Sequence, residues 1–270
     1  MGDDNDIVIQ DITPGDNDVL CGGNGEGDIL DYSATVFVLV EELDNGTLVN
    51  FNARTSINVN LKNNSVEKYR ENKFSAEKIL IGKDVVKQFE VLIATQGDDI
   101  ITLGTGKNII YAEAGDDIIY QTTAFSEDRI DGGLGFDSVD YSAVERLDVP
   151  ISGQPLWQLE NIDVDLTTGA AKKKYNNKNG ELAAKVDMLI NIESIIGTAG
   201  ADRLYGNHEK NLLNGGAGNN AFYGRGGNDQ LIGGVNNDIY WYQFGDGNDT
   251  IEELGGIDTL YRLRFNLTIS

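Results

Sequence analysis

Apolar residues return every nine positions along the last part of the chain, and each stands two places after an Asp or Asn. Between Gly197 and Glu252 these apolar residues are Leu204, Leu213, Phe222, Leu231 and Tyr240. The polar residues ahead of them are Asp202, Asn211, Asn220, Asp229 and Asp238. Each apolar residue and its neighbour can form a very short strand with one inward side chain, while the Gly-rich remainder of the unit must turn. The period therefore predicts stacked parallel coils with two strands per 18 residues.

The same pattern occupies an earlier stretch that begins at Thr95. Its apolar positions are Ile101, Ile110 and Ile119, which follow Asp99, Asn108 and Asp117. A gap of eleven then leads to Asp128 and a gap of nine to Asp137. The apolar residues of both stretches are predicted to point into the coil and to stack on their equivalents in neighbouring coils.

The Gly and Asp positions of these units suit a calcium ion. Glycine reaches positive φ at no steric cost, and Ca²⁺ takes six to eight oxygen ligands at about 2.3 to 2.6 Å. Stacked turns supply such oxygens from backbone carbonyls and from the sixth-position carboxylate. Carboxylates stacked about 4.8 Å apart repel one another unless a cation lies between them. A simple preference of Asp and Asn for turns is the alternative explanation, but it predicts no fixed period.

One unit, Gly132-Gly133-Leu134-Gly135-Phe136-Asp137-Ser138-Val139-Asp140, matches the pattern Gly-Gly-x-Gly-x-Asp-x-apolar-x at every fixed position. The units resemble the repeats of the RTX (repeats-in-toxin, haemolysin-type) calcium-binding family. This resemblance implies an all-β protein, a right-handed parallel β-roll or β-solenoid of nonapeptide repeats that binds several Ca²⁺ ions. Asn211 and Asn220 replace the Asp, and Glu209 and Asn236 replace the fourth-position glycine. These turns are expected to bind more weakly or to stay empty.

The resemblance also implies which residues hold the ions. The sixth-position ligands are Asp99, Asn108, Asp117, Asp128, Asp137, Asp202, Asn211, Asn220, Asp229, Asp238 and Asp249. The fourth-position glycines, through their carbonyls, are Gly97, Gly106, Gly115, Gly135, Gly200, Gly218, Gly227 and Gly247. Less regular acidic turns near the start of the chain add Asp6, Asp18 and Asp28, at gaps of twelve and ten.

The chain contains two copies of one module. Asp140-Tyr141-Ser142-Ala143 repeats residues 31–34 at an offset of 109, and Val164-Asp165-Leu166 resembles Val59-Asn60-Leu61 at an offset of 105. The first module is predicted over 1–139, with acidic turns, a β-rich excursion over 35–94 and a nonapeptide stack over 95–139. The second is predicted over 140–270, with an excursion over 144–196, a stack over 197–252 and a cap or truncated third copy over 253–270. Residues 62–90 fit a long excursion, a short helix or edge strands equally well.

Charge narrows the possible partners. There are 44 acidic and 21 basic residues, for a formal net charge of −23, which argues against nucleic acid and anionic membranes and favours cations. No run approaches the ~18 apolar residues of a membrane span, and the acidic start lacks the basic region of a signal peptide. The RTX resemblance implies instead that a type I secretion apparatus exports the chain, to the exterior or the cell surface.

Catalytic interpretations are weaker. The pairs Asp98-Asp99 and Asp116-Asp117 have the composition of glycosidase carboxylates, but they recur as repeat elements, which favours structural metal binding. His208 is the only histidine and falls in a repeat turn. Lysines gather in the excursions, over residues 54–87 and 146–185, where they form either a solvated face or a face that docks a glycan or cell-surface ligand.

The leading hypothesis is a non-catalytic extracellular module, not an enzyme, that is largely disordered without calcium and folds on binding it. The alternatives are the non-catalytic repeat portion of an extracellular polysaccharide-modifying enzyme and a segment of an adhesin. The biological partner, the number of occupied sites and the oligomeric state do not follow from the sequence.

Overall fold

The computed structural model describes residues 7–10, 17–22, 28–33, 37–42, 48–53, 55–71, 78–87, 89–122, 125–144, 157–177 and 182–263. Asp6 lies outside these ranges. The described residues form strands and turns without a helix, which confirms the all-β prediction, and so none of them belongs to a helix that could cross a membrane. They divide into two compact units, here called the first unit (1–120 with 129–137) and the second unit (121–128 with 138–270). The module boundary after residue 139 stays a prediction.

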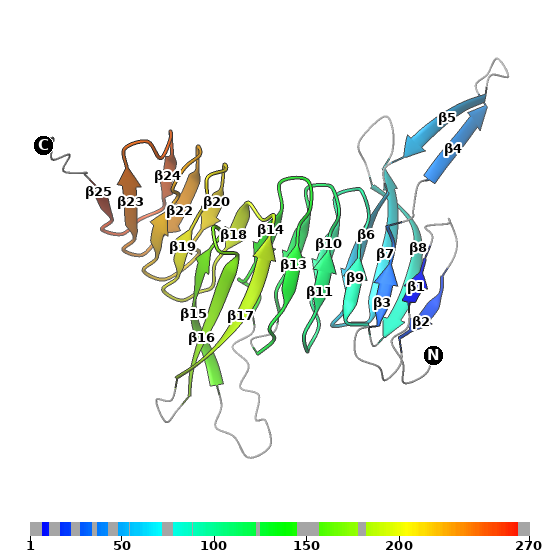
Figure 1. The fold of residues 1–270 in the computed structure, drawn as a ribbon, viewed down its shortest axis with the longest axis horizontal. Coiled ribbons are helices and arrows are strands. Elements are labelled where there is room, and N and C mark those ends of the chain that lie inside the picture. Colours follow the sequence, from blue (N-terminus) through cyan, green and yellow to red (C-terminus); the bar gives the residue numbers. More distant parts are fainter. Residues whose placement is uncertain are drawn as a thin grey trace, which may run out of the picture. The chain divides into compact units, whose positions relative to one another are not determined.

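The first unit builds its coil from short parallel strands on two faces (Figure 1). On one face the order is β1 (Ile7–Ile9), β3 (Ile29–Asp31), β9 (Val91–Ile93), β11 (Ile109–Tyr111) and β13 (Arg129–Asp131). On the other it is β2 (Val19–Cys21), β8 (Lys78–Lys87), β7 (Ser65–Glu71), β6 (Thr55–Asn60), β10 (Ile100–Thr102) and β12 (Ile118–Tyr120). A separate antiparallel pair, β4 (Phe37–Glu42) and β5 (Leu48–Ala53), lies within the predicted β-rich excursion over 35–94.

The second unit repeats this plan. One face has the order β17 (Leu182–Ile190), β16 (Ala170–Asn177), β15 (Trp157–Asp165), β19 (Arg203–Tyr205), β21 (Ala221–Tyr223), β23 (Ile239–Gln243) and β25 (Thr259–Leu263). The other has β14 (Ser138–Asp140), β18 (Ser194–Ile196), β20 (Leu212–Asn214), β22 (Gln230–Gly234) and β24 (Thr250–Glu253). Successive nonapeptides therefore alternate between the faces, so the prediction of two strands per 18 residues is confirmed.

Each unit interrupts its coil with one three-stranded antiparallel excursion, β6–β7–β8 in the first and β15–β16–β17 in the second. The first hairpin turn of each contains a residue with positive φ, Asn64 at 57° and Gly169 at 68°, which lets the chain reverse tightly. The first strand of each excursion also pairs in parallel with a coil strand, β6 with β10 and β15 with β19. Residues 62–90 thus contain strands β7 and β8 as part of a long excursion, and each strand pairs with a neighbour on both sides, so neither is an edge strand.

The core is a ladder of inward side chains, as the period predicted. Ile101, Ile110, Ile119, Leu204, Leu213 and Phe222 are 0% exposed, and Leu231 and Tyr240 are 2% exposed. Strand register places Leu204 beside Phe222 and Phe222 beside Tyr240, whose rings stack at 5.0 Å between centroids. Burying each such side chain contributes roughly 1.5–3 kcal/mol, so the short strands are stabilised mainly by this ladder.

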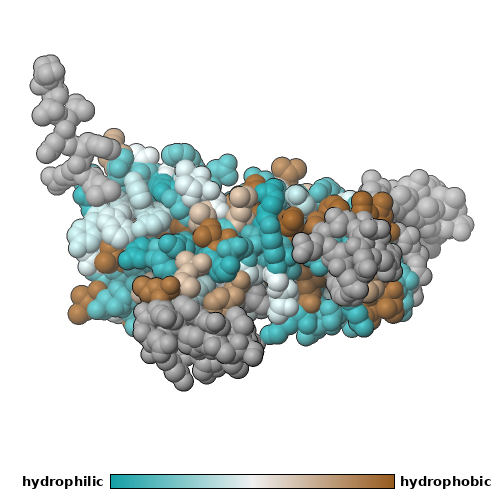
Figure 2. Space-filling model, turned by 60° about the horizontal axis from the view of Figure 1, so that its bottom comes forward, coloured by the Kyte–Doolittle hydropathy of each residue, from teal (hydrophilic) through white to brown (hydrophobic). Residues whose placement is uncertain are grey.

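The surface mixes hydrophilic and hydrophobic residues, as the face drawn in Figure 2 shows. Part of this mixture follows from strand β17, where side chains alternate between the interior and solvent. Its buried members include Asp187 and Leu189, while Leu182, Val186 and Met188 are exposed. The excursion therefore presents apolar side chains to solvent and places a carboxylate in the interior.

Candidate metal centre

Sixth-position residues of alternate turns are joined directly to one another in the first unit. The backbone N–H of Asp99 donates to Oδ1 of Asp117 at 2.7 Å, and that of Asp117 donates to Oδ1 of Asp137 at 2.9 Å. All three side chains are buried, at 0–1% exposure. The turns on this edge thus carry a column of interior carboxylates, which we call the first-unit column.

The second unit has two such columns. One runs Asp202, Asn220, Asp238 and Asp258, with N–H to Oδ1 distances of 3.0, 2.6 and 2.9 Å. The other runs Asn211, Asp229 and Asp249, with distances of 2.9 and 3.1 Å. This is the alternate stacking that the repeat order predicted. Asp258 is absent from the predicted ligands, although it stands nine places after Asp249 and two before Leu260, because Glu253 replaces the first glycine of that unit.

The first glycine of a unit is also part of the site. A Cβ on Gly197 would lie 2.5 Å from Oδ2 of Asp202, and one on Gly233 would lie 2.6 Å from Oδ2 of Asp238. Gly206, Gly215 and Gly224 meet the sixth-position side chain of their own unit in the same way. The sixth-position side chain therefore folds back over a residue that cannot carry a side chain of its own.

Fourth-position glycines stack from turn to turn. A Cβ on Gly135 would meet the carbonyl oxygen of Gly115, and one on Gly218 would meet that of Gly200. Several also have φ between 93° and 146°, where L side chains are strained: Gly115, Gly135, Gly218, Gly227 and Gly247. Gly97 crowds the carbonyl of Thr55 in the same manner, whereas Gly106 has nothing within 4 Å of its Cβ position. Except at Gly106, the backbone at these fourth-position glycines thus packs directly against a backbone carbonyl of a neighbouring turn.

Burial and mutual repulsion raise the pKa values of the carboxylates in these columns. Burial first, and then the nearby carboxylates of Asp99, Asp137 and Asp98, raise the pKa of Asp117 to about 8, although the hydrogen bond from the Asp99 backbone acts to lower it. Burial likewise raises the pKa of Asp229 to about 6, with Asp249 and Asp246 adding to the effect. The pKa of Asp238 is raised by burial first and then by Asp258. A cation between the turns would remove this penalty.

Some buried carboxylate oxygens in the described ranges have no hydrogen-bond donor: Oδ2 of Asp117, Asp229 and Asp238, and Oε2 of Glu253. Oxygens of Asp238, Glu253 and Asp258 also lie within 4.8 Å of one another. Hard anionic oxygens that the protein leaves without donors are the ligands that Ca²⁺ prefers. The donor set therefore fits calcium.

The first turn of each nonapeptide stack is satisfied differently. Oδ2 of Asp99 accepts from the N–H of Thr95 at 2.8 Å, and Oδ2 of Asp202 accepts from that of Thr198 at 2.6 Å. The hydroxyls of both threonines donate to the same carboxylates. Even so, burial raises the pKa of Asp99 to about 7 and that of Asp202 to about 6. At the first turn of each of these columns, hydrogen bonds from a threonine therefore stabilise the carboxylate, as a cation would do in part.

The Asn side chains that replace Asp donate hydrogen bonds to nearby backbone carbonyls. Nδ2 of Asn220 donates to the carbonyls of Gly218 and Gly233 at 3.2 and 3.3 Å, and Nδ2 of Asn108 donates to that of Gly106 at 3.2 Å. Nδ2 of Asn211 donates to the carbonyl of Glu193 at 3.3 Å. An amide thus points N–H groups at nearby backbone carbonyls, and the weaker binding expected at these turns stays a prediction.

The earlier acidic turns and the turn of Asp128 keep the backbone bond to a carboxylate, but that carboxylate does not come from a nonapeptide. The N–H of Asp28 donates to Oε2 of Glu90 at 3.0 Å, so a glutamate takes the place of the next sixth-position residue. Asp18 and Asp128 each stack instead on an aspartate of an excursion, Asp84 and Asp187, beside a buried lysine. No local feature of the sequence marks these two lysines as buried.

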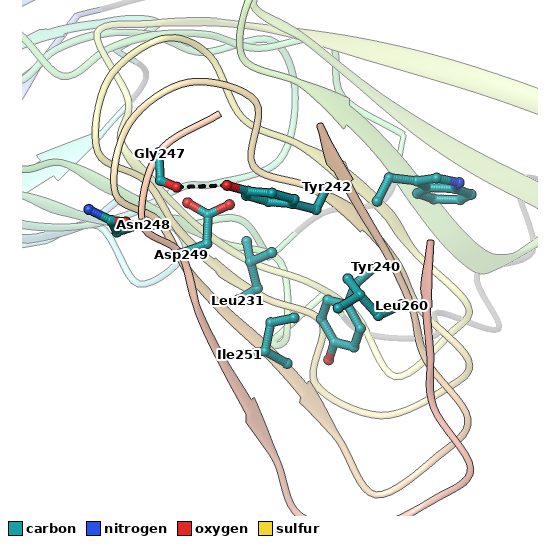
Figure 3. Close-up of a pocket in the computed structure, with 9 residues that line it drawn as sticks. Leu231, Tyr240, Tyr242, Gly247, Asn248, Asp249, Ile251 and Leu260 are labelled. Carbon is teal, nitrogen blue, oxygen red and sulfur yellow. Dashed lines mark hydrogen bonds between the residues drawn. The ribbon is translucent and has the colours of Figure 1, made fainter. Parts of the chain in front are cut away.

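A pocket opens at the last coil of the second unit, lined by Leu231, Tyr240, Ile251 and Leu260 (Figure 3). Above it the hydroxyl of Tyr242 donates to the carbonyl of Gly247 at 3.1 Å. Ile251 and Leu260 are 39% and 61% exposed because β24 and β25 are the outermost described strands at this end. The pocket therefore lies at the end of the core ladder among the described residues, and residues 253–263 continue the coil.

Comparison with known protein families points to the same chemistry. The family model described as RTX calcium-binding nonapeptide repeat (4 copies) matches residues 90–120, 191–220 and 209–240. The comparison with curated proteins gave no match. Repeats of this family bind Ca²⁺ in their turns, and several copies imply several ions. Residues 90–120 and 191–240 therefore match RTX calcium-binding nonapeptide repeats.

Proposed function

We propose that this chain is a non-catalytic calcium-binding module that works outside the cell and completes its folding when calcium fills the columns. The observation that carries the proposal is the set of buried carboxylate oxygens without donors, at Asp117, Asp229 and Asp238. Each belongs to a column in which the next turn carries another carboxylate. Ionising such a column without a cation is costly, so the folded form gains most from metal there.

The proposed ligands come from the three columns. They are the carboxylates of Asp99, Asp117, Asp137, Asp202, Asp229, Asp238, Asp249 and Asp258, the carboxylate of Glu253, and the carbonyls of Gly97, Gly115, Gly135, Gly200, Gly218, Gly227 and Gly247. Calcium supplies positive charge between the stacked turns. Asn108, Asn211 and Asn220 are weak members because their amides already donate to carbonyls. Asp18 and Asp128 are left out because a lysine ammonium lies beside their partners.

The non-catalytic and extracellular parts of the proposal rest on two arguments. The buried carboxylates recur as column members, whereas catalytic carboxylates act as a single pair. Extracellular calcium sites have affinities of about 10⁻⁴ to 10⁻³ M, so cytosolic calcium would leave them empty and a millimolar exterior would begin to fill them. A chain that is incompletely folded inside the cell suits export through a type I secretion apparatus.

A calcium titration of the chain in excess chelator tests the proposal. Far-ultraviolet circular dichroism should report a cooperative gain of β-structure near millimolar free calcium, and isothermal calorimetry should report several ions. Magnesium serves as the matched control, since its octahedral preference suits these turns poorly. A spectrum that is fully β-rich in chelator and unchanged by calcium would contradict the proposal.

A further inference from the structure

Each unit contains a lysine whose side chain is completely buried. Lys68 lies on β7 and Lys173 on β16, the middle strands of the two excursions, and both are 0% exposed. The neighbours on β16 differ, since Lys172 is exposed and Lys174 is half-buried. A buried ammonium ion is costly unless an opposite charge lies beside it, so each lysine requires a partner in the interior.

In the first unit that partner is Asp84. The ammonium of Lys68 lies 2.9 Å from Oδ1 of Asp84, and neither side chain is exposed. The same oxygen accepts the backbone N–H of Asp18 at 3.0 Å, while Oδ2 accepts the hydroxyl of Tyr32 at 2.6 Å. The side chain of Gln10 in turn donates to Asp18.

The second unit contains the same group of residues. The ammonium of Lys173 lies 2.8 Å from Oδ1 of Asp187, which also accepts the N–H of Asp128 at 2.9 Å. Oδ2 of Asp187 accepts the hydroxyl of Tyr141 at 3.1 Å, and Gln121 donates to Asp128 at 2.6 Å.

Lys173 also reaches two further oxygens. Its ammonium donates to Oγ of Ser126 at 3.2 Å and lies 3.9 Å from Oδ2 of Asp128. Three oxygens thus surround a group with three N–H donors. The offsets between equivalent residues of the two units fall from 111 at Gln121 to 103 at Asp187, in the order of the module repeat. The buried lysine is therefore a property of the module, not an accident of one excursion.

The bond from Asp128 to Asp187 is the bond that links sixth-position residues in the calcium columns. In both cases a backbone N–H donates to Oδ1 of the aspartate stacked on it, at 2.9 Å here and 2.9 Å from Asp117 to Asp137. Asp18 and Asp84 repeat it at 3.0 Å. The lysines thus stand beside stacked aspartates, where a column would otherwise need a metal ion.

We propose that Lys68 and Lys173 are built-in cations that replace calcium at one stacked pair in each unit. Each excursion, with the turn beside it, then folds without metal and offers a preformed edge on which the calcium-dependent coils assemble. Because the positive charge belongs to a lysine side chain of the protein itself, this part of the fold does not depend on the calcium concentration. The inference concerns the chain in chelator and does not depend on which turns hold calcium.

Hydrogen–deuterium exchange with mass spectrometry, on the full chain in excess chelator, tests this directly. Amides of β15, β16 and β17 should exchange slowly, while those of β19 to β24 exchange as in an unfolded chain. Lys173→Met keeps the apolar stem and removes the charge, and should speed exchange in β15–β17 by about tenfold or more. Lys172→Met, on the exposed neighbour, is the matched control and should leave exchange unchanged.

A double variant separates charge neutralisation from packing. Lys173→Met combined with Asp187→Asn removes both charges and should restore much of the protection that the single variant loses. Rapid exchange of β15–β17 in the unmodified chain would overturn the proposal. So would equal exchange in the Lys173→Met and Lys172→Met variants, or a double variant no better protected than Lys173→Met.

Discussion

The backbone N–H of Asn220 donates to Oδ1 of Asp238 at 2.6 Å, so an amide side chain and a buried carboxylate share one column. The amide of Asn220 fills with N–H donors the space that a cation would take, whereas Oδ2 of Asp238 has no donor. Two turns of one column thus differ in their need for metal. This contrast underlies the first prediction.

Asn220→Asp should turn a self-satisfied turn into a calcium-dependent one. The new carboxylate lies between Asp202 and Asp238, so the chain should fold less readily in chelator and bind calcium about tenfold more tightly, or about 1.4 kcal/mol. Calorimetry and circular dichroism measure the two effects. Ala217→Asp places the same charge at an exposed position of that turn and is the control. Equal behaviour of the two variants would show that the column is not the metal site.

Glu253→Gln should weaken the ion at the end of the second unit. Glu253 accepts the hydroxyl of Tyr240 and lies within 4.8 Å of Asp238 and Asp258. Removing one of three ligand charges should lower affinity at this site by about tenfold, the lower end of changes around metal sites. Terbium luminescence excited through Tyr240 reports this ion, and Glu252→Gln, on the exposed neighbour, is the control. An unchanged terbium titration would remove Glu253 from the ligand set.

Asp229→Ala and Asp238→Ala should remove different ions. Asp229 stacks between Asn211 and Asp249, while Asp238 stacks between Asn220 and Asp258. Each variant should bind fewer ions, and the double variant should lose the sum of the two. Calorimetric stoichiometry decides the matter. If the double variant lost no more ions than either single variant, the assignment of two columns would be wrong.

Acid should promote folding in chelator and oppose it in calcium. The folded pKa values of Asp117 and Asp99, about 8 and about 7, lie above the ordinary value of about 3.9, so the metal-free folded form binds protons more tightly than the unfolded chain. Its stability is greatest below pH ~4 and is lost as the pH rises through ~8. With calcium bound the carboxylates are ionised, and protons compete with the metal. Circular dichroism between pH 5 and 8, with chelator or calcium, should therefore show opposite slopes.

Much of the coil could be predicted because its signal is local and periodic. The inward position of Leu213 or Phe222 follows from the nine-residue repeat, and so does the stacking of Asp202 on Asn220. The excursions were harder, since Lys68 and Lys173 occur among exposed lysines and nothing in their immediate sequence marks them as buried. Their interior position depends on Asp84 and Asp187, which lie on another strand. Only the repeated offsets between the two modules carried that information.

The position of a residue within its column determines how many neighbouring gaps between turns a substitution affects. A column of stacked turns has one fewer gap than it has turns, and every interior residue borders two gaps while an end residue borders one. Asn220 borders the gaps to Asp202 and to Asp238, whereas Asp258 borders only the gap to Asp238 among the described residues. A single amide in the middle of a column therefore weakens two bridges at once. The place of a substitution within its column, as much as its chemistry, sets how many ions the chain loses.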